Sequence, residues 1–576
     1  MGIAVGHAAD LGAVGDDARG VDPGSTGVEE GRGGTAGDRR LLAALLVAVN
    51  TPIAVATVRA LARGWQPVGD NGILLVRARD VGTAHHPLLG SWTSASRLLG
   101  VDVNNPGPLY SDLLAPVIRL LGPWVGLAVG VMLVNMAASS LAVLAARRLT
   151  GAESMVAVAL AVVGLQWALG SELLFDVWQP NALVLPFLAF LVTVTVLATG
   201  DMAMAPWVAA VGSLVVQTHV SHAVPVAVLA VAATALCVRA VRRGDRRGAR
   251  RGPLLAAAAV MVLAWCQPLI EQFGGPGRGN LSRLAGAAAT GEGPAAIGPA
   301  EAGRLVVEVA VMSGWFTRES YASAVPLGMP VVPVPIIGTV PSLVVLAAIG
   351  LAVVLGTIWA ARAGRARAAT LFAMAGLAVA AAWAALATAP PSEFSVVAHQ
   401  MRWMWSVSAF VSAALLVAVL SLGRARRDLH RRVVVAGAVV VALVAVANLP
   451  SHTSRSQGPI ADADHLDTTR ALMGQLGSLE GRGTVLYDTS TLGFAEPYSG
   501  PTFAELQDRG IPFVVAEDDH VSVRQLGEGR RDHGTADLRL WQVIGPGARD
   551  IPPGVERVAF SEGPSGPVAL FVEPIG

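Results

Sequence analysis

The chain has 576 residues, of which 53% are hydrophobic and only 14% are charged, and its formal net charge is +1. These values exclude an ordinary soluble domain, which carries more charge and less apolar surface. They indicate a polytopic α-helical membrane protein, because long apolar runs must dominate such a composition.

The N-terminal 38 residues are rich in Gly, Ala and Asp and show no hydrophobic period, so we expect residues 1–38 to be a disordered cytoplasmic tail. From residue 39 to residue 450, apolar runs recur that are long enough to cross a bilayer. They predict about eleven transmembrane helices, at residues 40–62, 122–146, 153–171, 180–199, 205–219, 223–241, 253–271, 339–361, 368–389, 403–422 and 432–449.

Basic clusters between these runs predict the orientation of the chain in the membrane. The clusters begin at Arg39, Arg147, Arg242, Arg362 and Arg424, and all of them fall on the side of the N-terminus. Because Lys and Arg collect on the cytoplasmic side, we expect a multi-pass plasma-membrane protein with a cytoplasmic N-terminus. The outer loops are then residues 64–121, 171–180, 271–338 and 390–402.

The segment after the last apolar run, residues 451–576, changes character. It alternates short β-branched runs with Gly and Pro turns and contains one helical pattern at residues 501–510. We expect a small extracytoplasmic α/β domain without a catalytic motif. Its predicted strands are residues 483–488, 511–516, 538–543, 558–560 and 568–572.

The first outer loop begins with Gly69-Asp70-Asn71, directly after the first apolar run. A carboxylate at this boundary is suited to act as a general base that removes a proton from a hydroxyl group. It is also suited to bind a divalent cation such as Mg, Mn or Ca. The alternative is that Asp70 caps a helix that starts near Asn71.

Other polar residues follow in the same loop. Asp80 lies on an amphipathic helical pattern that predicts a helix in the membrane interface with its charges facing water or a site. It either contacts substrate or pairs with Arg77 three positions earlier. The remaining candidates offer hydrogen bonds to the hydroxyl groups of a sugar or an acceptor. They are His85, His86, Asn104 and Asn105.

The second outer loop carries Glu172 and Asp176, which are spaced i,i+4. If the segment is helical, both carboxylates share one face, where they attract a cation or a substrate. Trp178 follows at once and suits the face of a sugar ring. The alternative is a solvated loop.

Polar residues also mark the outer ends of later apolar runs. Gln217, His219 and His222 mark the outer end of the fifth run, at a depth where polar and ionisable groups are costly and usually functional. The two histidines are suited to contact the phosphate of a donor, and Gln217 is suited to contact a sugar or an acceptor. Arg402 precedes the tenth run, and arginine is a natural phosphate ligand. The alternatives are packed structural histidines and an interfacial arginine anchor.

These motifs together resemble the GT-C superfamily of membrane glycosyltransferases, especially its actinobacterial branch that uses polyprenyl-phosphate sugars. The resemblance covers most of residues 40–450. It rests on Gly69-Asp70-Asn71, Arg77-Ala78-Arg79-Asp80-Val81-Gly82-Thr83, His86-Pro87-Leu88 and Asn105-Pro106-Gly107-Pro108-Leu109, supported by Gln217-Thr218-His219 and Arg402-Trp403.

The resemblance implies a role for several of these positions. Asp70 matches the catalytic base of the family, and Glu172 or Asp176 matches a second acidic position that assists or binds metal. Arg402 and His219 match residues that hold the lipid phosphate. The mannosyltransferase pattern has an adjacent Asp-Glu pair, whereas Asn71 follows Asp70 here, which leaves metal use open.

The implied function is inverting transfer of a sugar from a polyprenyl phosphate to a cell-envelope glycan or glycolipid at the outer membrane face. An arabinofuranosyltransferase or mannosyltransferase of cell wall biogenesis fits this description, with membrane lipids and no nucleic acid as partners. The alternatives are a flippase or transporter of lipid-linked sugars and a non-catalytic envelope assembly protein.

Overall fold

The computed structural model describes residues 36–243, 251–275, 277–290, 296–311, 338–389, 401–422, 427–449, 463–493 and 496–575. Three predicted segments lie outside these residues for all or most of their length. They are the tail at residues 1–38, residues 312–337 of the third outer loop and residues 390–400 of the fourth.

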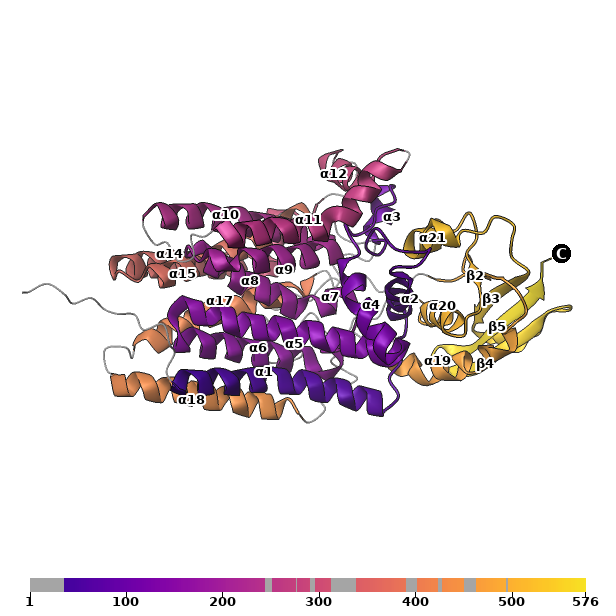
Figure 1. The fold of residues 1–576 in the computed structure, drawn as a ribbon, viewed down its shortest axis with the longest axis horizontal. Coiled ribbons are helices and arrows are strands. Elements are labelled where there is room, and N and C mark those ends of the chain that lie inside the picture. Colours follow the sequence, from indigo (N-terminus) through magenta and orange to yellow (C-terminus); the bar gives the residue numbers. More distant parts are fainter. Residues whose placement is uncertain are drawn as a thin grey trace, which may run out of the picture.

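A helical bundle forms most of the molecule (Figure 1). The described residues contain ten helical segments long and apolar enough to cross a membrane, which identifies a multi-pass membrane protein. They are formed by α1 (Ala36–Ala62), α5 (Pro123–Thr150), α6 (Ala152–Leu173), α7 (Gln179–Ala182) running into α8 (Val184–Ala198), α10 (Ala223–Arg242), α11 (Arg251–Gly274), α14 (Thr339–Arg362), α15 (Ala366–Thr388), α17 (Met404–Leu422) and α18 (Arg427–Ala447).

The fifth apolar run is shorter than a full span. It forms α9 (Ala205–Thr218), which follows a short turn that begins at Met202. The carboxylate of Asp201 caps that turn, and His219 ends the helix with extended backbone. Within the described residues, ten of the eleven predicted spans are therefore long enough to cross a membrane, and the fifth is a short apolar helix.

Burial separates the central helices from the peripheral ones. Every side chain in the apolar window of α8 is buried, whereas nearly all of α14 faces outward. The centre packs alanine and valine from α6 against phenylalanine from α8 and α17, so the helices approach closely. The outward apolar surface of α14 is what a lipid-facing helix requires.

Residues 463–575 form the C-terminal domain, which contains a five-stranded mixed sheet in the order β2-β1-β3-β5-β4. Strand β1 runs parallel to β2 and β3, and β5 runs antiparallel to β3 and β4. The small sheet domain is the one that the sequence predicted. Its elements are α19 (Leu466–Met473), β1 (Val485–Asp488), α20 (Ser499–Asp508), β2 (Phe513–Val514), α21 (His520–Leu526), β3 (Leu538–Ile544), β4 (Glu556–Gly563) and β5 (Gly566–Pro574).

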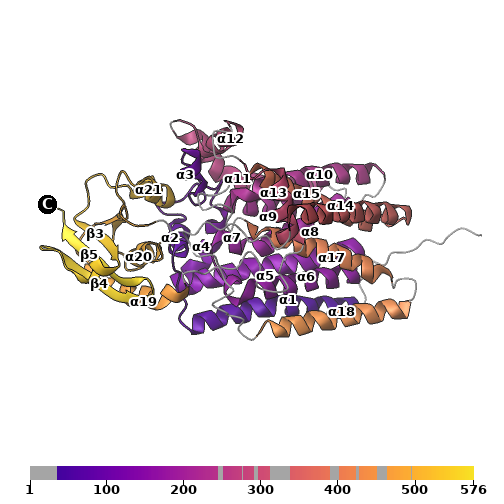
Figure 2. The same cartoon turned by 180° about the vertical axis from the view of Figure 1, so that it is seen from behind.

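The C-terminal domain covers one end of the bundle, next to α2 (Asp70–Asp80) and α4 (Leu109–Leu121) (Figures 1 and 2). The predicted helix is present, but the prediction that its charges face water does not hold for Arg77 and Asp80. Arg77 and Asp80 are 4% and 3% exposed, because α20 and α21 pack against the helix. The amphipathic pattern predicted the helix, but it could not show that the C-terminal domain packs against the polar side of that helix.

Candidate functional site

Asp70 is the first residue of α2 and directly follows a sharp turn of the chain. Gly69 precedes it with a φ of 58°, a left-handed conformation that favours glycine, and the chain can therefore turn abruptly into the helix. Gly69 occupies the cap position of α2, and no side chain there caps the helix. The capping alternative for Asp70 is therefore wrong.

The Asp70 carboxylate is reached by solvent, yet protein surrounds it densely. This burial raises the pKa of Asp70, and the charges of Glu496 and Asp176 raise it further. In the opposite direction, Trp178 donates its Nε1–H to Oδ2 at 3.2 Å and lowers the pKa. A carboxylate with a raised pKa and open access is suited to accept a proton from a hydroxyl group.

Asp176 lies beyond the end of α6 and not on it. The helix kinks at Gly170, whose φ is 73°, and ends at Leu173. Glu172 and Asp176 therefore do not share one continuous helical face, contrary to the prediction from their spacing. The side chain of Glu172 lies outside the described residues.

Asp176 is buried and accepts hydrogen bonds on both carboxylate oxygens. Asn71 Nδ2 and the backbone N–H of Trp178 donate to Oδ1 at 2.7 and 3.2 Å. Asn181 Nδ2 donates to Oδ2 at 2.5 Å. Burial raises the pKa of Asp176, whereas these bonds and the charge of Arg402 lower it.

Arg402 is completely buried, and its guanidinium donates to Asn181 Oδ1. Burial lowers its pKa to about 10, and the negative charge of Asp176 opposes that shift. Asn181 thus bridges a buried acid and a buried base through its amide. A charge at this depth is retained only with such partners.

The structure therefore brings together residues from three distant parts of the sequence. Residues near Asp70, residues near Asp176 and Arg402, just before α17, meet through two asparagines, Asn71 and Asn181. Four predicted site residues belong to this group, which we call the acidic site: Asp70, Asp176, Trp178 and Arg402.

Sequence reasoning missed four members of the acidic site: Asn71, Tyr110, Asn181 and Glu496. Tyr110 is buried close to Asp176, and its hydroxyl has no partner among the described residues. Glu496 comes from the C-terminal domain and acts electrostatically on Asp70. Asn71 directly follows Asp70, and Asn181 lies three residues after Trp178. This closeness in sequence to predicted site residues was the signal that could have identified them.

Asp80 lies elsewhere, at the joint with the C-terminal domain. Its carboxylate forms a buried ion pair with Arg530 at 2.8 Å, and Arg77 donates instead to the carbonyls of Gln525 and Leu89. The ring of His85 lies within electrostatic reach of Asp80 and Arg530. His86 accepts the backbone N–H of Gly82 at 2.8 Å, which fixes the turn between them.

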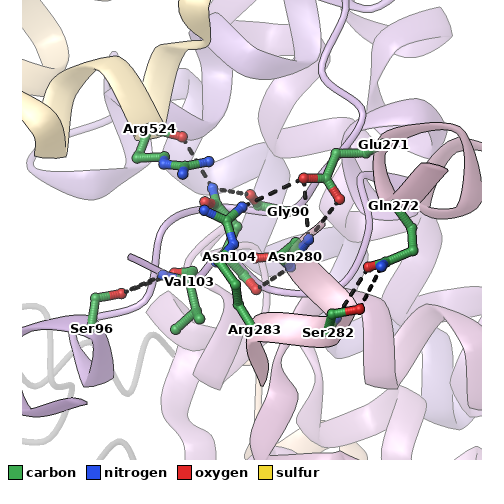
Figure 3. Close-up of polar contacts among 10 residues, drawn as sticks. All are labelled: Gly90, Ser96, Val103, Asn104, Glu271, Gln272, Asn280, Ser282, Arg283 and Arg524. Atoms are coloured by element: carbon green, nitrogen blue, oxygen red, sulfur yellow. Dashed lines mark hydrogen bonds and ion pairs between the residues drawn. The ribbon is translucent and has the colours of Figure 1, made fainter. Parts of the chain in front are cut away.

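Asn104 belongs to a second junction, drawn in Figure 3. It exchanges two hydrogen bonds with Asn280, at 2.8 and 2.9 Å, and donates to the carbonyls of Gly90 and Arg524. Its partners come from the first loop, α12 (Asn280–Thr290) and α21. The two bonds with Asn280 use the backbone of Asn104, and the other two use its side-chain Nδ2, so this buried residue connects segments and does not point to open space.

The remaining predicted polar residues hold the α9–α10 connection. Asn105 accepts the backbone N–H of Val220 at 2.9 Å, and Gln217 donates to the carbonyl of Ala264 at 2.7 Å. His219 Nδ1 lies 2.8 Å from Ser221 Oγ.

The ring of His222 packs against aromatic side chains near Arg402. Its centroid lies 5.0 Å from that of Phe187 and 5.9 Å from that of Trp403. Its Nε2 is buried without a partner among the described residues. His222 therefore packs between Phe187 and Trp403, while its Nδ1 lies near the carbonyl of His219 at 3.3 Å.

No group of three His, Cys, Asp or Glu side chains converges within the described residues as a metal site would require. Both oxygens of Asp176 already accept N–H groups, so this carboxylate is a poor fit for a cation. Asp70 has one side-chain donor and open access, and is the better candidate ligand.

No protein-family model matches the sequence, and no curated protein matches it. Solved structures do match its fold. The crystal structure of ArnT from Cupriavidus metallidurans bound to undecaprenyl phosphate superposes with a TM-score of 0.51 at 15% identity. The match covers 93% of this chain and 98% of ArnT.

The structure of the same ArnT in the apo state gives a TM-score of 0.48 at 13% identity, over 92% of this chain and 97% of that one. The match to the lipid-bound structure includes nearly the whole of both chains. This protein therefore has the GT-C fold, with a helical membrane bundle followed by a small sheet domain.

Proposed function

We propose that this protein is an inverting glycosyltransferase that takes a sugar from a polyprenyl-phosphate donor at the outer face of the plasma membrane. The observation that carries the proposal is the acidic site, where a solvent-accessible carboxylate, Asp70, lies near a buried carboxylate, Asp176, that accepts three N–H groups. The GT-C fold shared with an undecaprenyl-phosphate-bound structure supports a donor of this class.

In this mechanism Asp70 accepts the proton of the acceptor hydroxyl as its oxygen attacks the anomeric carbon. The bond between that carbon and the phosphate oxygen breaks, and the polyprenyl phosphate leaves with the electron pair. Trp178 holds Asp70 through Oδ2, so Oδ1 is the oxygen that faces the proton. Such general-base assistance contributes about 10²–10⁴-fold in rate.

Asp176 and Arg402 act on Asp70 indirectly in this proposal. Asp176 fixes Asn71, the residue next to the base, and also the backbone of Trp178. The charge of Arg402 lowers the pKa of Asp176 and so favours its ionised form, against the effect of burial, and Asn181 bonds to both side chains. We therefore assign Arg402 to support of the acidic site and not to the donor phosphate, because its guanidinium is completely buried and donates to Asn181. A contact of His219 and His222 with the donor phosphate stays a prediction.

The acceptor is a cell-envelope glycan or glycolipid, and arabinofuranose and mannose are the sugars to test first. The experiment uses purified protein in proteoliposomes with synthetic polyprenyl phosphates that carry labelled arabinofuranose or mannose. Asp70→Asn is expected to lower transfer by about 10²–10⁴-fold while undecaprenyl phosphate still binds. Asp201→Asn, which alters an ion pair with Arg148 outside the acidic site, is the control.

The proposal is overturned if Asp70→Asn transfers sugar at the same rate as the wild-type protein. A flippase would instead move the lipid-linked sugar across the bilayer without forming a new glycosidic bond. An assembly protein would show neither transfer nor movement of the lipid.

A further inference from the structure

The C-terminal domain holds α2 at both ends. At the N-terminal end, the backbone N–H of Gly69 donates to the carbonyl of Pro497 at 2.8 Å. At the C-terminal end, Asp80 pairs with Arg530. The helix that begins with Asp70 is therefore fixed by residues more than 400 positions later in the chain.

The N-terminal contact is a direct approach of two backbones. A Cβ atom added to Gly72 would lie 2.1 Å from the carbonyl carbon of Gly500, and one added to Gly500 would lie 2.1 Å from the oxygen of Gly69. Only glycine fits at these crossing points, since a side chain would push the helices apart. The turn that precedes Asp70 therefore rests on α20 without an intervening side chain.

The C-terminal contact is a buried, multiply bonded ion pair. Arg530 lies 2.8 Å from Asp80 Oδ1, and Gln507 Nε2 donates to the same oxygen at 2.7 Å. The guanidinium also stacks over Phe513 at 4.1 Å from the ring centroid. Because both charged side chains are less than a tenth exposed, loss of one partner would leave the other charge buried.

Apolar packing joins the two contacts into one unit. Leu75 and Val76 of α2 belong to the same buried cluster as Phe503 and Leu506 of α20 and Leu526 of α21. Close-packed interiors transmit displacement, so a shift of α20 moves α2. The position of Asp70 is therefore set by the C-terminal domain as well as by the membrane bundle.

We propose that the C-terminal domain is a positioning element of the active site, with Gly500 and Arg530 as positioning residues that hold Asp70 in register with its substrate. This inference rests on the proposed function of Asp70 as the base. Placement of a catalytic group tolerates very little error, and a shift of about 1 Å costs about 10²-fold in rate.

The decisive variant is Gly500→Ala. Its Cβ would start 2.1 Å from the Gly69 oxygen, well inside any normal contact, so α20 and the turn must separate by about 1 Å. We expect kcat to fall by about 10²-fold, while KM for the donor and binding of undecaprenyl phosphate stay unchanged. The matched control is Gly547→Ala in the same domain, where the added Cβ meets only Val543 at 3.6 Å.

A second pair of variants covers the case in which Gly500→Ala does not fold. Arg530→Gln is expected to lower kcat per site that binds undecaprenyl phosphate, and Arg530→Lys to restore part of it by keeping the charge opposite Asp80. Arg549→Gln is the control, because it breaks an exposed ion pair with Glu562 in the same domain.

The outcomes separate the inference from the proposed function. If the wild type transfers sugar and the Gly500 and Arg530 variants keep its kcat, the positioning role is refuted. If these residues only stabilise the fold, the variants will have fewer lipid-binding sites but an unchanged kcat per site. That outcome also refutes the positioning role. If the wild type transfers no sugar from any donor, the proposed function fails first.

Discussion

Replacing Asn181 with leucine tests whether a buried acid and a buried base are joined through one amide. Leucine keeps the approximate size of the side chain but removes the donor to Asp176, at 2.5 Å, and the acceptor for Arg402. Each hydrogen bond to a charged group contributes about 1.5–3 kcal/mol. The two bonds together therefore predict a loss of about 3–6 kcal/mol.

The matched control is Asn135→Leu. Asn135 is equally buried, but its amide donates one bond, at 2.9 Å, to the neutral carbonyl of Leu174. Loss of a neutral bond costs about 0.5–1.5 kcal/mol. Asn135→Leu therefore makes the same change of side-chain shape at a buried position, but removes no bond to a charged group.

The assay is thermal unfolding of both variants in lipid nanodiscs, followed by tryptophan fluorescence, with sugar transfer measured in parallel. We expect Asn181→Leu to unfold at a clearly lower temperature than Asn135→Leu and to lose most of its transfer activity. Equal unfolding temperatures for the two variants would refute the bridge, because they would show that neither charge depends on Asn181.

Three further predictions concern pH and topology. Trp178→Phe removes a hydrogen bond that lowers the pKa of Asp70, so the acidic limb of kcat/KM should move to higher pH, because a base must be deprotonated to act. Glu496→Gln removes a negative charge that raises the same pKa, so that limb should move to lower pH; shifts of the same sign in both variants would contradict these assignments. In a cysteine-free background, Gly493→Cys in the C-terminal domain should react with an impermeant maleimide added outside intact cells, whereas Arg147→Cys should not.

The membrane part of the fold was predictable from sequence because hydrocarbon imposes a local rule. A spanning helix needs about 20 apolar residues in succession, and that requirement is visible without any tertiary information. The strands of the C-terminal domain were predictable for a similar local reason, their alternation between turns. The short α9 shows the limit, because its length depends on the cap at Asp201 and the extended backbone at His219.

The site was predictable only where a residue carries unusual chemistry in an apolar context. Asp70, Asp176 and Arg402 stood out for that reason and lie together in the structure. The joint between α2 and the C-terminal domain was not predictable. It depends on two glycines, Gly72 and Gly500, whose approach has no signature within either segment.

The environments of the two carboxylates divide the chemical roles between them. Asp176 is buried, accepts three N–H donors on its two oxygens and faces a buried arginine, so a substrate hydroxyl does not reach it. Burial raises the pKa of both carboxylates, but Asp70 accepts one side-chain donor and is reached by solvent. When two neighbouring acids differ in this way, the less bonded one is the proton acceptor and the other orients it. The same division explains why Asp176→Asn should disturb the fold around the base, whereas Asp70→Asn should remove the proton acceptor and leave the surrounding structure in place.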